Sequence, residues 1–177
     1  LDCASIASLR DLKRQIEREI AKRGMNNNIK LGKGGIREIE FIVQSFQLIH
    51  GGRDRDLQPA PVIPMLATLE NKGFMAAEDV AQLCNAYFFL RDVEHLLQAW
   101  RDEQTQLLPR DDTQQKRLAW LMGFSNKDAF DADLQNHRDN VQRIFAAVIA
   151  PAADESCAEE SGNWQHLWDG SGDIETD

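Results

Sequence analysis

The sequence has few of the residues that build β-strands or interrupt helices. Its 177 residues include one tyrosine, five prolines and eleven glycines, and runs rich in Val, Ile, Thr and aromatic residues are scarce. Strands favour β-branched and aromatic runs, whereas Pro and Gly interrupt helices. We therefore expect an all-α fold, an antiparallel helical bundle of about five to six helices with an acidic C-terminal extension.

Cysteines and long apolar runs are also scarce. The three cysteines, Cys3, Cys84 and Cys157, are widely spaced and form no CxxC pair, which argues for a reducing compartment and against a zinc site. No apolar run approaches the roughly 20 residues that a membrane-spanning helix needs, and no targeting stretch is visible. We expect a cytoplasmic protein with no membrane partner.

Basic residues are absent from the last part of the chain. The formal net charge is −9, and from Ala152 onward there are eight Asp or Glu residues and no Lys or Arg. We expect residues 1–151 to form a helical bundle domain and residues 152–177 to form an acidic linker or tail. Leu167 and Trp168 lie three and four residues after Trp164, on one side of a helical turn, which predicts a short amphipathic turn that docks.

Apolar residues at steps of three and four predict the helices of the bundle. In the last of them His137 lies within an apolar seam, where a histidine is more often a core residue than a ligand or a base. The helices are expected at about 6–23, 35–50, 62–72, 77–103, 113–122 and 126–150.

Residues 30–41 are not explained by helix formation alone. Three glycines and two lysines occur among residues 30–35, and apolar residues then recur from Ile36. A flexible cationic loop that leads into a helix N-terminus brings backbone N–H groups and positive charge together, which suits a phosphate or a carboxylate. A simpler interpretation also fits, in which the glycines mark a helix start and Lys33 and Arg37 are solvated charges. The stretch lacks the Gly-Lys-Ser/Thr of a Walker loop.

A second polar group lies along one side of the expected fourth helix and consists of Arg91, Glu94, His95 and Gln98. In a plain bundle such residues make local pairs at the boundary of the core. The other acidic pairs give no catalytic or metal signal. Asp54 and Asp56 fit solvated loop charges, and Asp111-Asp112 fits a helix cap.

Two blocks of the sequence carry a family resemblance. The string KLGKGGIREIEFIVQ, residues 30–44, resembles the segment that follows the nucleotidyltransferase domain in the glutamine synthetase adenylyltransferase and adenylyl-removing enzymes. The string YFFLRDVEHLLQ at residues 87–98, followed by DEQTQLLP at residues 102–109, is similar to that family's downstream pattern. The resemblance covers residues 1–151 and implies the helical domain next to the adenylyl-removing domain. Because residue 1 is not Met, we expect a domain of a longer chain.

The resemblance implies that the whole enzyme adds AMP from ATP to a tyrosine of glutamine synthetase and removes it by phosphorolysis, using Mg, ATP and phosphate. In that family the catalytic carboxylates occupy a Gly-Ser-x-Asp-x-Asp-type segment of the adjacent nucleotidyltransferase domain, and two Mg ions held by such carboxylates stabilise the displacement. This sequence has no such segment. We therefore expect no catalytic residue, metal ligand or cofactor site here, and no activity from this chain alone.

The resemblance also implies supporting contacts from this chain. Contacts to phosphate, nucleotide or substrate are expected from Lys30, Lys33, Gly34, Gly35 and Arg37. Two carboxylates, Glu38 and Glu40, are expected to orient those cations. The second polar group is expected to help form the active cleft.

Two other functions fit parts of the sequence. The chain could be a non-catalytic interaction module that docks glutamine synthetase or a PII-type regulator through its acidic tail and exposed helix faces. Nucleic-acid binding could use residues 1–37, where nine Lys or Arg residues against four Asp or Glu residues leave a net charge of +5. A nearly neutral body and an acidic tail count against that second function, because backbone binding needs a positive footprint. We expect no nucleic-acid partner.

Overall fold

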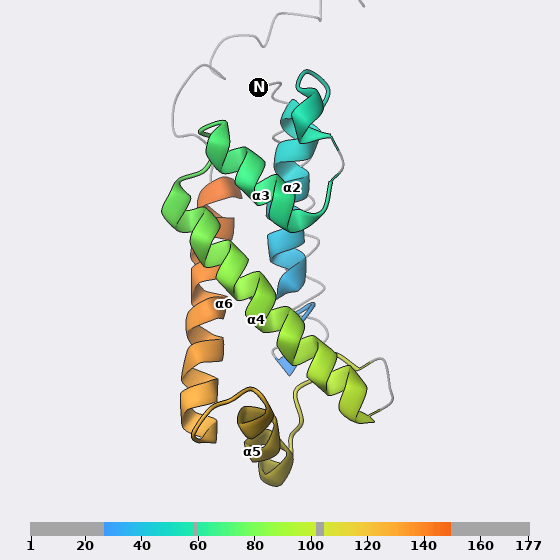
Figure 1. The fold of residues 1–177 in the computed structure, drawn as a ribbon, viewed down its shortest axis with the longest axis vertical. Coiled ribbons are helices and arrows are strands. Elements are labelled where there is room, and N and C mark those ends of the chain that lie inside the picture. The colour runs from blue at the N-terminus through green and yellow to red at the C-terminus, as the bar shows by residue number, and fades with distance from the viewer. Residues whose placement is uncertain (1–26, 59, 102–104, 150–177) are drawn as a thin grey trace, which may run out of the picture.

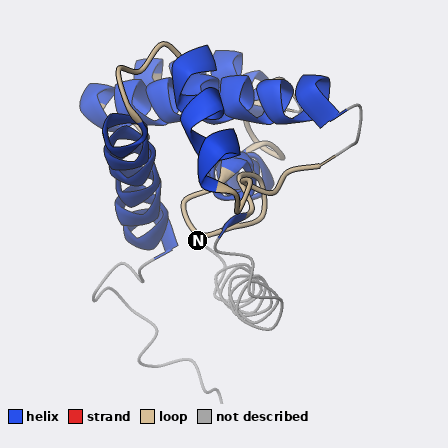
Figure 2. Ribbon diagram, turned by 90° about the horizontal axis from the view of Figure 1, so that it is seen from below, coloured by secondary structure: helices blue, strands red, loops and turns tan. Residues whose placement is uncertain are grey.

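The computed structural model describes residues 27–58, 60–101 and 105–149. Helices and loops make up this part of the chain (Figure 1, Figure 2), which contains no β-strand longer than one bridging residue. The helices are α2 (Ile36–His50), the short 3₁₀ helix η2 (Arg55–Leu57), α3 (Val62–Asn71), α4 (Ala77–Arg101), α5 (Asp112–Leu121) and α6 (Lys127–Ile149). The all-α prediction is confirmed. The expected first helix and the amphipathic turn of the tail lie outside the described residues, and the division at residue 151 stays a prediction.

Three long helices form the body of the bundle. Helix α4 runs in the opposite direction to α2 and α6 (Figure 1) and packs against both of them, while α2 and α6 also pack against each other. Helix α3 crosses one end of α2 and α4, and α5 packs against α4 and α6 at the other end. None of the described helices is both long and apolar enough to cross a membrane.

The apolar seams expected from the sequence form the core. In α2 the buried residues include Ile36, Ile39 and Ile42, and in α4 they include Leu90 and Val93, all with no exposed surface. Helix α6 contributes side chains on the same side at steps of three and four, namely Phe130, Leu134, Val141 and Ile144. Burial of these apolar surfaces is what holds the helices together.

Polar caps and glycines set the helix ends. Asp111 caps α5, because its side-chain oxygen accepts a hydrogen bond from the Gln114 amide at 2.9 Å, as the sequence predicts. Asn126 caps α6, because its side-chain oxygen accepts from the Ala129 amide at 2.8 Å. Gly73, just after α3, has a φ of +73°, a left-handed conformation that suits glycine.

Gly34 lies where the start of α2 meets α6. Its φ is +66°, and a Cβ placed on it would lie 2.4 Å from the carbonyl oxygen of Arg138 and 2.6 Å from that residue's Cα. The backbones of the two segments therefore meet with no room for a side chain. Gly35, the N-cap residue of α2, is also enclosed, since a Cβ there would lie 2.6 Å from the Lys30 carbonyl oxygen.

His137 lies in the packed seam between α6 and α4, as the sequence predicts. Its ring contacts that of Phe89 with a centroid separation of 4.5 Å, and its Nε2 atom is 3.6 Å from a carboxylate oxygen of Asp133. Burial lowers the pKa of His137 below its ordinary value, and the Asp133 carboxylate opposes that shift. The imidazole therefore packs as part of the apolar seam.

Substituting Gly34 by Ala should destabilise the chain more than substituting Gly73 by Ala. Both positions have a positive φ, which costs about 1 to 2 kcal/mol for a residue with a Cβ. Only Gly34 adds a clash with a neighbouring backbone, worth about 1 to 3 kcal/mol more. Gly73 has open space around it and is the matched control. Urea unfolding followed by circular dichroism measures both losses, and equal losses would contradict the close contact between α2 and α6.

The free energy of unfolding should fall as the pH drops from 7.5 to 5.5, partly through His137. Because burial depresses the folded-state pKa below the ordinary histidine value of 6.5, the unfolded chain binds the proton more readily, so this stability is present above that value and is lost below it. A His137→Gln variant should show a smaller fall over this range. An unchanged fall in the His137→Gln variant would contradict this contribution.

Candidate functional site

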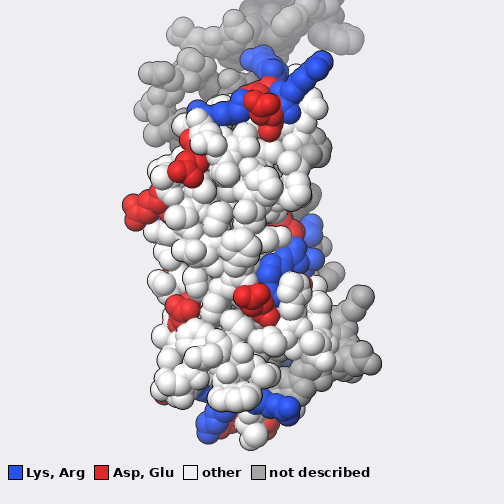
Figure 3. Space-filling model, viewed as in Figure 1, with Lys and Arg blue, Asp and Glu red and all other residues white. Residues whose placement is uncertain are grey.

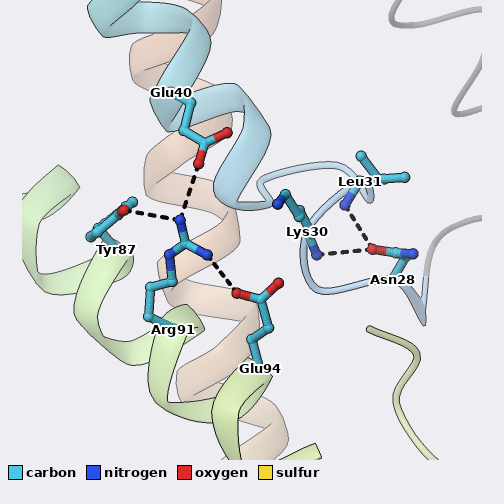
Figure 4. A network of polar contacts seen from close by, with 7 residues as sticks. All are labelled: Asn28, Lys30, Leu31, Glu40, Tyr87, Arg91 and Glu94. Atoms are coloured by element: carbon cyan, nitrogen blue, oxygen red, sulfur yellow. Dashed lines mark hydrogen bonds and ion pairs between the residues drawn. The ribbon is translucent and has the colours of Figure 1, made fainter. Parts of the chain in front are cut away.

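The glycine-rich loop before α2 is held in place by hydrogen bonds. The side-chain oxygen of Asn28 accepts from the amides of Lys30 at 2.9 Å and Leu31 at 2.7 Å (Figure 4). On the other side of the loop, the Ile29 amide donates to the Gln106 carbonyl at 2.8 Å. The sequence predicted a flexible loop, whereas the structure ties it to the segment that follows α4.

The backbone amides at the start of α2 also have partners within the chain. The Gly34 amide donates to a Glu38 carboxylate oxygen at 3.1 Å, and the Gly35 amide donates to the Gly32 carbonyl at 3.0 Å. The Arg37 amide donates to the Lys30 carbonyl at 3.1 Å. Gly34 and Gly35 are buried, so in this conformation an anion would meet side chains here before it met these amides.

The three cations predicted to contact an anion differ in exposure. Lys33 and Arg37 are exposed, on either side of the buried Gly34-Gly35 pair, and Lys30 is half-buried. No ion pair joins any of the three to a carboxylate in the part of the chain that the structure describes. Their charge is therefore not cancelled by a described neighbour in direct contact.

Glu38 and Glu40 contact groups other than those three cations. Glu38 is buried, with 4% of its surface exposed, and it accepts from the Gly34 amide and from Gln142 of α6 at 3.4 Å. Glu40 is 3.2 Å from the Arg91 guanidinium on α4. These contacts link α2 to α6 and to α4, and the role of the two carboxylates in orienting Lys30, Lys33 and Arg37 stays a prediction.

Arg91 of α4 makes three polar contacts, two within its own helix and one that reaches α2 (Figure 4). Its guanidinium donates to Glu94 at 2.7 Å, to Glu40 at 3.2 Å and to the Tyr87 hydroxyl at 3.1 Å. Burial lowers the pKa of Arg91, but the hydrogen bonds to Tyr87 and Glu94 raise it by more, so the net shift is upward. We call Glu40, Tyr87, Arg91 and Glu94 the Arg91 cluster.

The Arg91 cluster includes half of the second polar group predicted from sequence. Arg91 and Glu94 belong to it, while His95 is exposed and Gln98 is half-buried outside it. Two carboxylates and one guanidinium leave the cluster with a formal charge of −1, so it is poorly suited to bind a phosphate directly. Its geometry suits a brace between α2 and α4.

Arg138 of α6 lies at the site and was missed by the sequence analysis. Arg138 of α6 donates from Nη2 to the Asn28 carbonyl at 3.2 Å, and its charge interacts with that of Glu38. Burial lowers the pKa of Arg138, and Glu38 opposes the shift. A signal for Arg138 existed in the sequence, because it lies four residues after Leu134 and three before Val141, within the apolar seam.

The remaining acidic pairs have structural partners. Asp54 and Asp56 both contact the Lys72 ammonium, at 2.7 Å and 2.9 Å. The sequence analysis predicted solvated loop charges and did not identify this shared partner. The hydrogen bond from Lys72 lowers the pKa of Asp54. Among the described residues, no group of three or more His, Cys, Asp or Glu side chains is placed to hold a metal ion.

Removing Arg91 should destabilise the chain by about 1 to 3 kcal/mol, because Arg91→Ala leaves the buried Glu94 carboxylate without its guanidinium. The matched control is Arg143→Ala, which removes an ion pair to Asp79 from a side chain that is 53% exposed. That loss should not exceed about 1 kcal/mol. Urea unfolding of both variants tests this, and similar losses would mean that the Arg91 cluster is not a brace.

Comparison with known proteins places the chain in a family. Residues 10–149 match the family model described as GlnD PII-uridylyltransferase. The chain is 46% identical over 178 residues to the "Bifunctional glutamine synthetase adenylyltransferase/adenylyl-removing enzyme" of Pseudomonas putida. It is 45% identical over 181 residues to the protein of the same name from Pseudomonas aeruginosa.

Each of these matches covers 99% of this chain but only 18% of the relative, so the chain spans less than one fifth of the length of the curated relatives it matches. The match to the family model extends over most of the chain and includes both the loop before α2 and the Arg91 cluster. The chain thus belongs to the GlnD PII-uridylyltransferase family, in which the relatives it resembles are bifunctional glutamine synthetase adenylyltransferase/adenylyl-removing enzymes.

Proposed function

We propose that this chain is the non-catalytic helical domain of an enzyme that adenylylates and deadenylylates glutamine synthetase. In this proposal it follows a nucleotidyltransferase domain in the same polypeptide and completes the adenylyl-removing active site. The family match and the high identity to two bifunctional enzymes support this. The sequence itself has no Gly-Ser-x-Asp-x-Asp segment, so the bond-breaking chemistry is assigned to the neighbouring domain.

One observation carries the proposal. Lys33 and Arg37 are exposed on either side of a buried turn whose backbone is fixed by internal hydrogen bonds. Cations on a rigid support lose less conformational freedom when they bind an anion than cations on a mobile loop do. We assign Lys33 and Arg37, with half-buried Lys30 beside them, to contact a phosphate group in the assembled active site.

The cofactors of the whole enzyme would be Mg with ATP or phosphate. Carboxylates that hold Mg are assigned to the neighbouring domain, and this chain would add positive side chains around the phosphate. A shielded contact between a charged side chain and a phosphate is worth about 1.5 to 3 kcal/mol. His95 and Gln98 of the second polar group are proposed to line the same cleft, on the side of α4 that the Arg91 cluster braces.

The protein substrate is proposed from the relatives. Their names specify glutamine synthetase, whereas the family description specifies PII. Both names describe transfer of a nucleotidyl group, so a shared helical domain beside the transferase domain is consistent with both. Because the two named relatives are 45% to 46% identical to this chain, we propose glutamine synthetase as the substrate, in the cytoplasm, with a PII-type protein as a regulator.

A second candidate function is a helical interaction module that docks glutamine synthetase or a PII-type protein. One face of the molecule favours it. Figure 3 shows charged residues near the two ends and along both flanks of this face, while its middle is largely uncharged. Exposed aromatic residues also occur among the described helices, with Phe88 of α4 54% exposed and Trp120 of α5 73% exposed. Such surfaces are frequent in protein interfaces.

Replacing Arg37 by Ala in the full-length protein should reduce deadenylylation roughly tenfold or more, because one charge-assisted contact to phosphate is lost. Thermal unfolding should change little, since the Arg37 side chain is exposed. Exposed Arg53, beyond the opposite end of α2, provides the control, and Arg53→Ala should leave the rate unchanged. Phosphorolysis of adenylylated glutamine synthetase measures the effect.

The same assay separates the two functions. Unchanged phosphorolysis by the Arg37→Ala enzyme, together with weaker binding to glutamine synthetase or a PII-type protein, would favour the interaction module. Unchanged phosphorolysis and unchanged binding would reject the assignment of Arg37 to either function.

A further inference from the structure

A buried carboxylate occupies the first turn of α2, where an anionic ligand was expected. Glu38 has 4% of its surface exposed and accepts a hydrogen bond from the Gly34 amide at 3.1 Å. The positive end of a helix stabilises a carboxylate in this position. The helix N-terminus therefore stabilises the protein's own carboxylate in this conformation, and not an external anion.

A guanidinium on α6 complements this carboxylate. Arg138 interacts electrostatically with Glu38 and donates to the Asn28 carbonyl at 3.2 Å. Glu38 in turn accepts from Gln142, one helical turn further along α6, at 3.4 Å. The backbone of Gly34 lies so close to the Arg138 backbone that a Cβ added to Gly34 would clash with it. Both ends of the loop, at residues 28 and 34, are therefore connected to α6 through two side chains of opposite charge.

We propose that Glu38 and Arg138 act as a positioning pair that sets where Lys33 and Arg37 meet a phosphate group, an inference that rests on the function proposed above. Glu38 is separated from any ligand by the loop that it holds, so it acts through the Gly34 backbone. Lys33 directly precedes Gly34, and Arg37 directly precedes Glu38. A shift of the Gly34 amide would therefore move the Lys33 side chain relative to Arg37.

A charged pair at this place has a consequence that an apolar contact would lack. If either charge is removed, the other loses the opposite charge that it faces, which favours a shift of the loop that both side chains hold. In a purely structural pair, removing one charge would change only the stability of the fold. A positioning pair must also change the apparent affinity for phosphate in molecules that remain folded.

The phosphate group could belong to inorganic phosphate or to the AMP-tyrosine linkage of the protein substrate. Both present negatively charged phosphoryl oxygens to Lys33 and Arg37. Separate Michaelis constants, one for inorganic phosphate and one for adenylylated glutamine synthetase, distinguish the two sources.

The test uses Glu38→Gln in the full-length protein, because Gln keeps the shape and one acceptor but removes the charge. We expect the KM for one of the two substrates to rise on the order of tenfold, because Lys33 and Arg37 would be displaced from the phosphate group that they contact. Assays are run well below the melting temperature of each variant, which is measured by thermal unfolding. Gln142→Ala removes only the longer contact and should change KM by less than Glu38→Gln does.

Epistasis with the cations decides the proposal. In a Lys33→Ala/Arg37→Ala background the two cations that the pair positions are gone, so adding Glu38→Gln should raise KM no further. If Glu38→Gln instead multiplies KM by the same factor in both backgrounds, the positioning role is overturned. If Lys33→Ala/Arg37→Ala itself leaves both KM values unchanged, the proposed function fails first, and the two failures are thus distinguishable.

Arg138→Gln provides a second route to the same answer. It should raise the same KM as Glu38→Gln, and the double variant Glu38→Gln/Arg138→Gln should be no worse than the more affected single variant, since neither charge is then left alone. If Glu38→Gln does not fold, Arg138→Gln carries the epistasis test in its place. A fall in melting temperature with unchanged KM values in either variant would show that the pair is structural only.

Discussion

The contact between the start of α2 and the backbone of α6 constrains the rest of the site. Gly34 can approach Arg138 only because it has no side chain, and its φ of +66° turns the chain into the helix. Once the two backbones touch, Glu38 is enclosed and must find partners inside the protein. The Gly34 amide and Gln142 supply hydrogen bonds, and Arg138 supplies the opposite charge.

The Arg91 cluster extends the same arrangement to the third long helix. Glu40 lies two residues after Glu38 on α2, and the two carboxylates contact different helices, α4 and α6. One turn of α2 is thereby held from two sides by polar contacts in addition to its apolar seam. Such contacts contribute little net stability when fully satisfied, but they disfavour alternative packings in which a buried charge would lose its partner.

Much of the fold follows from local pattern, and much of the site does not. Steps of three and four placed Ile36, Leu90 and Val141 in the core correctly, because a helix face is determined by neighbours in sequence. The partner of Glu40 is Arg91, 51 residues away, and the partner of Asn28 is Arg138, 110 residues away. No periodicity encodes which helix faces which. The contact between the Ile29 amide and the Gln106 carbonyl was missed for the same reason, since Gln106 lies beyond α4.

The backbone amides of the loop are already hydrogen-bonded within the protein, and this changes how the loop could bind an anion. A glycine-rich loop with free amides would enclose a phosphate in backbone N–H groups, as nucleotide-binding loops do. Here the amides at the start of α2 already have acceptors, and the exposed charges are two side chains, Lys33 and Arg37. Two exposed cations alone bind a phosphate weakly and in a salt-dependent way. Useful affinity would require a second surface that excludes water and supplies further ligands, and a neighbouring domain packed over this loop would provide that surface.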